Sequence, residues 1–443
     1  MYPLIIILLT LFGVAVLLWL VFGINWRSSR NYERKHHRLH ARMQAEATEA
    51  LQRLLFSNSL TMRIEQRFRP LAMLLAKDGR PSVAASEVEI IISGRRKHDL
   101  LIGDILNAKE SIHMEYFHFG IDKSSRQIRR MLMAKARQGV KVRFINENIA
   151  NWPIPNIYFN SMRKAGVEVV NFSRSWSLLR FLMTLSYRDH RKIVVIDNRI
   201  GYTGGMNITK NYFTRWRDTH LRLTGEAVAS LQYAFLDTWL AAGGQLNYAV
   251  NSFFFHLDKP SCGQSLGTLT QVTPDDPTSP EPVLLTAYEW ILNHAQKYVW
   301  FQSPYIAPPP SLISAMRNAA QRGVDVRVMV PEHCDTAIMR PINKSYYAEL
   351  AQAGVQLYIR SGEFNHSKTL VCDDYLSCVG STNLDYRSFS IDYEINTFFY
   401  DRAVALQQKQ IFENDLPICR LVIAAEAHPT PWQRLMRHLA PIV

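Results

Sequence analysis

Cysteine is scarce in this 443-residue chain, and none of its five cysteines forms a CxxC pair. Neither a zinc site nor a disulfide framework is therefore indicated, and the sparse, odd count suits a reducing compartment. Low-complexity tracts are also missing. With 47% hydrophobic and 20% charged residues, the composition excludes a disordered chain, a collagen and a coiled-coil rod. A chain of this length suits two domains, or one domain duplicated.

Acidic residues are also in short supply: 38 Asp and Glu stand against 51 Lys and Arg, a net charge of +13. Such an excess favours an anionic partner, either a nucleic acid or an anionic membrane surface. Part of it is concentrated near the N-terminus, where only Glu33 opposes Arg27, Arg30, Arg34, Lys35, Arg38 and Arg42. The remainder is only moderately basic, which weakens the nucleic-acid interpretation. No GxxxxGK[ST] loop is present, so nucleotide energy is not implied.

Long hydrophobic runs are limited to one, Leu4–Ile24, in which only Thr10 is distinctly polar. As a helix this run would span about 31 Å, close to the hydrocarbon thickness of a bilayer. Nothing basic precedes it and no Ala-x-Ala-like site follows, so a retained anchor over residues 1–25 is favoured over a cleaved signal peptide. The basic run after it then predicts a single-pass protein of the inner (cytoplasmic) membrane, with residues 25–443 in the cytoplasm.

The rest of the sequence repeats itself. Three pairs of segments match in type and order, each a strand or the end of a helix followed by a strand: Ser111–Phe117 with Tyr298–Tyr305, Ala134–Arg143 with Asn318–Arg327, and Lys164–Val170 with Gln352–Tyr358. Strands that alternate with helices in this way predict an α/β fold of two similar halves, each a β-sheet flanked by helices.

These patterns divide the chain into five parts. The anchor at 1–25 is followed by a basic juxtamembrane segment and helical neck at 26–87, a first half at 88–256 and a second half at 283–443. A linker is expected at 257–282, where Asp, Pro, Ser, Gly and Thr concentrate.

Each half contains one HxKxxxxD motif, His190–Asp197 in the first and His366–Asp373 in the second. The β-rich run after each lysine predicts a strand, on which positions i and i+2 share a face. Each motif therefore presents a histidine together with a lysine, as His190 with Lys192 and His366 with Lys368. An imidazole beside a fixed positive charge suits attack on a phosphate ester.

Further polar residues follow both motifs at matched distances. Asn207 follows His190 at the same spacing at which Asn383 follows His366, and Asp218 and Glu394 are likewise equally far from the histidines of their halves. A lone HxK is usually a surface pair, whereas two motifs with two further matched positions form a strong signal. The alternative, that both histidines are strand residues without a catalytic role, is therefore disfavoured.

With these motifs, the sequence resembles the phospholipase D superfamily, in which two HKD half-sites form one active site. Within it the resemblance, over about 88–443, is to bacterial cardiolipin synthases. The segments that carry it are His113–Phe117, Tyr187–Asp197, Thr203–Asn207, Trp216–Arg222 and Gly380–Phe389. The chain departs from relatives in Ser367, where alanine is usual, in Thr278–Pro282, and in having one long hydrophobic run where many relatives have two.

The resemblance implies two phospholipase D-like repeats related by a pseudo-two-fold axis, with both histidines at one phosphorus. One histidine forms a phosphatidyl-histidine, and the other protonates the leaving alkoxide and then deprotonates the incoming alcohol. We favour His190 as the nucleophile and His366 as the acid/base; the pseudo-symmetry leaves the reverse assignment open as the alternative. The implied catalytic set comprises the motif residues His190, Lys192, Asp197, His366, Lys368 and Asp373.

Both lysines of this set, together with Asn207 and Asn383, would hold the phosphate oxygens. Asp218 and Glu394 would each accept a hydrogen bond from the far nitrogen of a histidine and fix its tautomer. Asp197 and Asp373 would brace the site through structural ion pairs. No cofactor is implied, because the lysines supply the positive charge.

The molecule that accepts the phosphatidyl group decides the function. A second phosphatidylglycerol would give cardiolipin and glycerol, which is the favoured interpretation, whereas water would make the protein a phospholipase D. Another phosphatidyltransferase, an HKD nuclease and a non-catalytic scaffold are the alternatives. The expected partners are phosphatidylglycerol, cardiolipin and an anionic membrane surface, without nucleic acid. A homo-oligomer is left open.

The halves differ just before the first motif. The stretch from Gly166 to His190 is twice as long as the matching stretch from Gly354 to His366. The added length falls in 174–187, which is rich in Trp, Leu, Phe and Met with spaced arginines. This composition suits either an interfacial segment at the lipid entrance or a helix buried in the core or a subunit interface.

Overall fold

The computed structural model describes residues 41–43, 45–172, 187–254, 267–277, 279, 281–425 and 427–440. The expected anchor at 1–25 and nearly all of segment 174–187 lie outside these residues. Among the helices that are described, none is long and apolar enough to cross a membrane.

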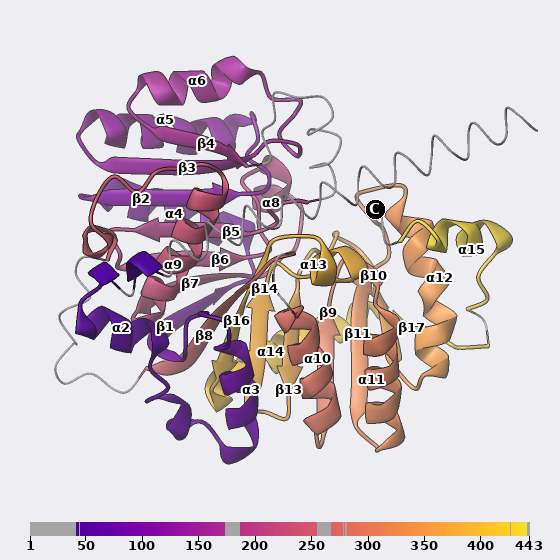
Figure 1. Cartoon of the computed structure of the whole chain (residues 1–443). Coiled ribbons are helices and arrows are strands. Elements are labelled where there is room, and N and C mark those ends of the chain that lie inside the picture. The colour runs from indigo at the N-terminus through magenta and orange to yellow at the C-terminus, as the bar shows by residue number, and fades with distance from the viewer. Residues whose placement is uncertain are drawn as a thin grey trace, which may run out of the picture.

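Helices and strands alternate through both halves (Figure 1). Two neck helices, α2 (Glu49–Phe56) and α3 (Arg69–Leu75), come first. The first half contains β1 (Ala84–Ile91), α4 (Gly94–Asn107), β2 (Ser111–Tyr116), α5 (Lys123–Arg137), β3 (Lys141–Glu147), α6 (Asn156–Lys164), β4 (Glu168–Phe172), β5 (Lys192–Ile196), β6 (Ile200–Gly204), α8 (Lys210–Thr214), β7 (His220–Gly225) and α9 (Ala227–Ala241).

The second half repeats this series. It contains β8 (Thr268–Asp275), α10 (Val283–His294), β9 (Tyr298–Gln302), β10 (Ile306–Ala307), α11 (Pro310–Gln321), β11 (Asp325–Pro331), α12 (Met339–Gln352), β12 (Gln356–Arg360), β13 (Thr369–Cys372), β14 (Leu376–Gly380), β15 (Leu384–Asp385), α13 (Tyr386–Ser390), β16 (Glu394–Tyr400) and α14 (Arg402–Asp415), and ends with β17 (Cys419–Leu421) and α15 (Pro431–Arg437).

One mixed sheet of 15 strands runs through both halves, and its strand order is symmetric. The halves meet where β1 pairs antiparallel with β8, with Ala85 opposite Leu269. Outward from this pair the first half runs β1-β7-β6-β5-β2-β3-β4 and the second runs β8-β16-β14-β13-β9-β11-β12, followed by the edge strand β17, which has no counterpart in the described part of the first half. The expected α/β fold with two similar halves is confirmed, and the strand order is the one that a two-fold axis through the β1–β8 pair produces.

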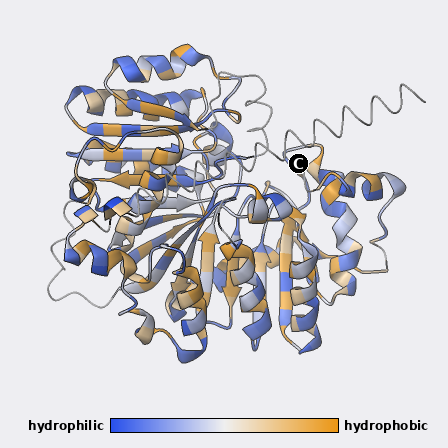
Figure 2. Cartoon of the chain, in the orientation of Figure 1, coloured by the Kyte–Doolittle hydropathy of each residue, from blue (hydrophilic) through white to orange (hydrophobic). Residues whose placement is uncertain are grey.

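The strands that carry the two motifs are buried on both faces. All residues of β5 and of β13 are buried, because helices cover the sheet on both sides. Hydrophobic residues follow the strands, while the covering helices carry residues of both kinds (Figure 2). Helix α9 is hydrophobic on almost all sides, since it packs on strands from both halves, including β5 and β8.

The expected linker at 257–282 needs correction. Strand β8 (Thr268–Asp275) lies inside it, pairs with β1 and β16, and occupies in the second half the place of β1 in the first. Its polar composition favours a loop, but its three threonines are β-branched, and the burial of Thr270 and Thr273 within the sheet overrides the polarity. The first half likewise begins slightly earlier than expected, at Ala84.

Candidate active site

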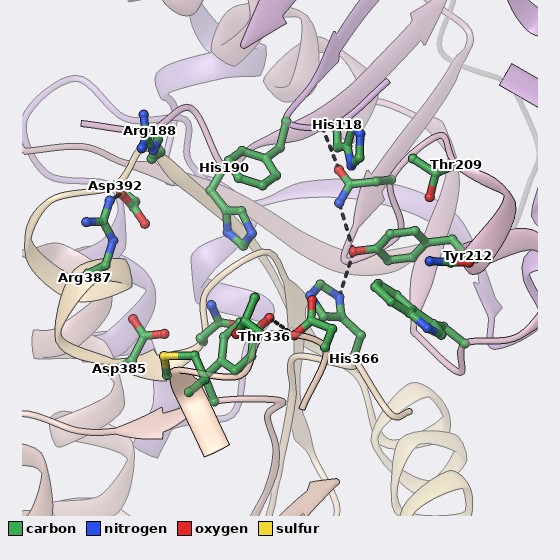
Figure 3. Close-up of a pocket in the computed structure, with 18 of the residues that line it drawn as sticks. His118, Arg188, His190, Thr209, Tyr212, Thr336, His366, Asp385, Arg387 and Asp392 are labelled. Carbon is green, nitrogen blue, oxygen red and sulfur yellow. Dashed lines mark hydrogen bonds and ion pairs between the residues drawn. The ribbon is translucent and has the colours of Figure 1, made fainter. Parts of the chain in front are cut away.

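His190 and His366 lie just before β5 and β13 and face one cavity of about 840 Å³. Its wall comes from both halves (Figure 3). Residues between Phe117 and Trp216 in the first half, and between Tyr305 and Asp392 in the second, contribute side chains to it. The structure therefore brings both HxKxxxxD motifs to one site.

Backbone hydrogen bonds hold each histidine to the opposite half. The His190 N–H donates to Tyr393 O at 2.9 Å, and the Tyr393 N–H donates back to Arg188 O at 2.8 Å. In the symmetric place, the His366 N–H donates to Arg217 O at 2.7 Å, and the Arg217 N–H donates to Phe364 O at 3.0 Å. Each histidine is thus fixed by the residues that precede the acid of the other half.

The histidine–carboxylate pairs also cross between the halves. His190 Nδ1 lies 2.9 Å from Glu394 Oε1, and His366 Nδ1 lies 2.8 Å from Asp218 Oδ2. Both carboxylates are fully buried. In each pair the nitrogen that contacts the carboxylate is Nδ1, so Nε2 is the ring nitrogen that is not bonded to an acid. Neither half contains a complete histidine–carboxylate pair.

Gly205, in the segment Thr203–Asn207, makes room for Asp218. A Cβ on Gly205 would lie 2.2 Å from Asp218 Oδ1, and Gly204 has a φ of +132°. Asp218 Oδ1 also accepts the Thr219 N–H at 2.6 Å. In the second half Ser381 replaces the second glycine and donates its hydroxyl hydrogen to Glu394 Oε2. The two acids are therefore held differently.

The motif lysines are buried beside their histidines. Lys192 Nζ donates to His190 O at 2.5 Å, and Lys368 Nζ donates to His366 O at 2.6 Å and lies 3.0 Å from His366 Nε2. Burial lowers the pKa of Lys192 to about 7 and that of Lys368 to about 8. Two cations this close to the cavity form a site that an anion would stabilise.

Burial and the neighbouring lysine lower the pKa of each histidine well below its ordinary value. Burial acts the other way on Asp218 and raises its pKa to about 6. A phosphate anion between the histidines would offset the lysine charges and raise both histidine pKa values again. The site can therefore take up its catalytic proton together with its substrate.

The two asparagines line the cavity. Asn207 Oδ1 accepts the His118 N–H at 3.2 Å, and its Nδ2 donates to Tyr212 Oη at 2.9 Å. Tyr212 Oη lies in turn 3.4 Å from His366 Nδ1. Asn383 Oδ1 is buried and has no hydrogen-bond partner within the described part of the chain. Tyr212 could not be found by comparing the repeats, because Ser388 stands at the matching place.

The motif aspartates lie at the other ends of their strands and do not line the cavity. Asp197 accepts the N–H groups of Lys109, Glu110 and Ser111, each at 2.8 Å. Asp373 does the same for Gln296, Lys297 and Tyr298 at 2.8–3.0 Å, and the expected ion pair exists there, with Arg67 at 2.8 Å. Both aspartates thus bind backbone N–H groups at strand ends, away from the cavity.

The middle residue of each HxK also reaches the opposite half. Ser367 Oγ accepts from Arg217 Nη1 at 2.8 Å and lies 3.1 Å from Thr219 Oγ1, so it contacts both neighbours of Asp218. Arg191 Nε donates to Glu394 O at 3.0 Å. Ser367 thus holds the segment that carries Asp218 in place.

Comparison with known proteins places this geometry in a family. Residues 101–239 and 289–416 match the family described as "Cardiolipin synthase, PLD-like domain". The chain is 33% identical to "Major cardiolipin synthase ClsA" of Bacillus subtilis, with 98% of this chain and 92% of the relative covered. It is 34% identical to a cardiolipin synthase of Geobacillus kaustophilus, with 87% of this chain and 76% of the relative covered.

Solved structures share the fold. A phosphatidylserine synthase from Haemophilus influenzae matches with a TM-score of 0.63 at 15% identity, covering 86% of this chain and 100% of that one. A polyphosphate kinase from Porphyromonas gingivalis matches with a TM-score of 0.53 at 12% identity, covering 80% of this chain and 52% of that one. Both HxKxxxxD motifs lie in the matched family segments, and the chain belongs to the cardiolipin synthases of the phospholipase D-like family.

Proposed function

We propose that this protein is a cardiolipin synthase: it transfers the phosphatidyl group of one phosphatidylglycerol to the headgroup hydroxyl of a second and releases glycerol. The observation that carries the proposal is the pair of crossed contacts, His190 with Glu394 and His366 with Asp218, at one cavity. Family membership supports the same activity.

In the first step, His190 Nε2 attacks the phosphorus of the donor lipid. The bond from phosphorus to the glycerol oxygen breaks, and protonated His366 gives its proton to that oxygen. Glycerol leaves, and the phosphatidyl group remains on His190. Glu394 accepts the His190 Nδ1–H throughout and stabilises the positive charge that the ring acquires.

In the second step, neutral His366 takes the proton from a hydroxyl of the second phosphatidylglycerol. That oxygen attacks the phosphorus, the phosphorus–nitrogen bond breaks, and cardiolipin forms with His190 restored. One phosphodiester replaces another, so the exchange needs no external energy source.

Cationic and amide groups of the cavity stabilise the negative charge on the phosphate oxygens. Lys192 and Lys368 lie beside the two histidines, and Asn207 and Asn383 line the same cavity. Preorganised charges in a buried site stabilise a transition state more than the same charges in water. This chain's own lysines thus supply the positive charge that the reaction requires.

We also propose that an N-terminal anchor holds the protein in the cytoplasmic membrane, with the catalytic halves on the cytoplasmic side. The sequence of residues 4–24 and the basic run that follows support this placement. A reporter fused after Val443 should resist membrane-impermeant labels in intact cells, and labelling from outside would refute this topology.

The activity can be tested with purified protein and phosphatidylglycerol in micelles, with cardiolipin, phosphatidic acid and glycerol separated. Cardiolipin and glycerol should form in equal amounts with little phosphatidic acid. His190→Ala and His366→Ala should each abolish both products. Phosphatidic acid as the main product would make the protein a phospholipase D, and full activity in either variant would refute the two-histidine scheme.

A further inference from the structure

The two ends of the active-site cavity carry different chemistry, although symmetry relates them. Arg188, Arg387 and Asp392 line the end beside His190 (Figure 3). At the other end, Asn211 occupies the place that Arg387 has at the first end, and Trp216 occupies the place of Asp392. Asn211 follows Asn207 at the same spacing at which Arg387 follows Asn383. Trp216 precedes Asp218 at the same spacing at which Asp392 precedes Glu394.

The same contrast holds for the residue two places before each histidine. Arg188 precedes His190, whereas Phe364 precedes His366 and packs against Trp216 with ring centroids 4.9 Å apart. The arginines are therefore not needed to build this type of cavity wall, because the fold builds the symmetric wall with aromatic and amide groups. Their function must be sought in what the cavity binds.

The arginines come from different halves, and one of them has an unused donor. Arg387 Nη2 pairs with Asp392 Oδ1 at 2.8 Å. Arg188 Nη1 is buried without a hydrogen-bond partner among the described residues. Burial lowers the pKa of Arg188, and the nearby Arg387 lowers it further while Glu147 opposes the shift. Two guanidinium groups at one cavity end, one with an open donor, form an anion-binding arrangement.

The proposed reaction provides a second anion. Cardiolipin carries two phosphodiesters joined by a three-carbon bridge. When one of them lies between the histidines, the other must lie elsewhere in the cavity or its mouth. We propose that Arg188 and Arg387 bind this second phosphate, which belongs to the acceptor phosphatidylglycerol before transfer. This inference rests on the proposed function and names the group that would favour a lipid acceptor over water.

The alternative is a structural role for both side chains. It is weakened by the unused donor of Arg188, since a buried guanidinium group placed for stability normally has its hydrogen bonds satisfied. Both ends carry two aspartates, Asp385 and Asp392 beside the arginines and Asp122 and Asp335 at the opposite end, but among the described residues only the first end has two guanidinium groups to offset their charge. The arginine end is thus the electrostatically favoured place for it.

The test compares two acceptors for the same donor, short-chain phosphatidylglycerol. Exchange of labelled glycerol into phosphatidylglycerol uses an acceptor without phosphate, and cardiolipin formation uses an acceptor with one. Arg188→Gln should lower cardiolipin formation about tenfold or more, since a charge-assisted contact is lost, but change glycerol exchange less than about threefold. Arg188→Lys keeps the charge and should recover much of the loss.

Two further variants control for folding and for general charge. The double change Arg387→Gln with Asp392→Asn removes the second guanidinium group without leaving an unpaired buried acid, and should give the same selective loss. Lys210→Gln removes an exposed cation from the opposite end of the cavity and should leave the ratio of the two rates within about twofold.

The outcomes separate this inference from the proposed function. An equal fall in both reactions with Arg188→Gln, no fall in either, or a selective loss with Lys210→Gln alone would refute the second-phosphate site. A wild-type protein that exchanges glycerol but forms no cardiolipin would instead refute the proposed function.

Discussion

Replacing the two histidine-bound acids by their amides should have unequal effects. Asp218 uses both oxygens as acceptors, Oδ2 for His366 Nδ1–H and Oδ1 for the Thr219 N–H. Asparagine offers one acceptor, so in Asp218→Asn an NH₂ group must face either a backbone N–H or the histidine. If it faces the histidine, Nδ1 must give up its hydrogen, and the tautomer reverses.

Glu394 is held by the hydroxyl of Ser381, which can either donate or accept a hydrogen bond. Its Oε1 accepts from His190 Nδ1, and its Oε2 accepts from the hydroxyl of Ser381. In Glu394→Gln the amide can keep its oxygen toward His190 and donate its NH₂ to Ser381 Oγ, because a hydroxyl both donates and accepts. The histidine tautomer survives, and only the negative charge is lost.

The expected magnitudes follow from these contacts. Loss of charge alone turns a charge-assisted hydrogen bond into a neutral one, about 1–2 kcal/mol, so Glu394→Gln should slow the reaction about 5- to 30-fold. A reversed tautomer adds the loss of a usable base and is known to cost about 10⁴-fold in a comparable triad, so Asp218→Asn should slow it about 10³- to 10⁴-fold.

The assay is the initial rate of cardiolipin formation at saturating phosphatidylglycerol, with thermal unfolding measured on the same samples. Both variants should melt within a few degrees of the wild type, since each substitution is isosteric. Equal losses, or a larger loss for Glu394→Gln, would refute the argument from hydrogen-bond partners. Wild-type rates in Asp218→Asn would mean that the carboxylate merely packs beside its histidine.

The remaining predictions concern pH, packing and stability. The alkaline limb of kcat/KM should have an apparent pKa between about 7 and 8, because the free enzyme loses the charges of Lys192 and Lys368 as the pH rises through their lowered pKa values; a pH–rate profile flat to about pH 9 would contradict this. Gly205→Ala should lower the rate at least about 100-fold, because its Cβ would displace Asp218, and an unchanged rate would refute that contact. Asp197→Ala should lower the free energy of unfolding by about 2–4 kcal/mol in urea, because it leaves three N–H groups without their acceptor, whereas a purely catalytic aspartate would leave stability unchanged.

The sequence predicted those parts of the site that the two halves share. His190 and His366, their lysines, the asparagines and the acids recur at equal spacing, and the structure brings all of them except the motif aspartates to one cavity region. The sequence could not predict that each acid pairs with the histidine of the other half. Equal spacing is satisfied as well by pairs within a half as by pairs between halves, and only the β1–β8 junction decides between them.

Features that occur in only one half were not predicted, because comparing the halves gives no signal for them. Arg188 and Arg387 have no basic counterpart in the other half, so comparing the halves gave them no weight. The polar composition of β8 favours a linker, and the strands that bury it, β1 and β16, lie far from it in the sequence. Local patterns do not encode such distant contacts.

The covalent intermediate tests the account most directly. Phosphatidylglycerol labelled with ³²P should be mixed with the wild type and, separately, with His190→Ala, quenched with alkali within seconds, and the labelled peptide identified by mass spectrometry. Alkali-stable label should appear on the peptide that contains His190 in the wild type and should be absent in His190→Ala. Label on His366 would exchange the two roles, and the absence of label from both histidines, in a protein that makes cardiolipin, would contradict transfer through a phosphohistidine.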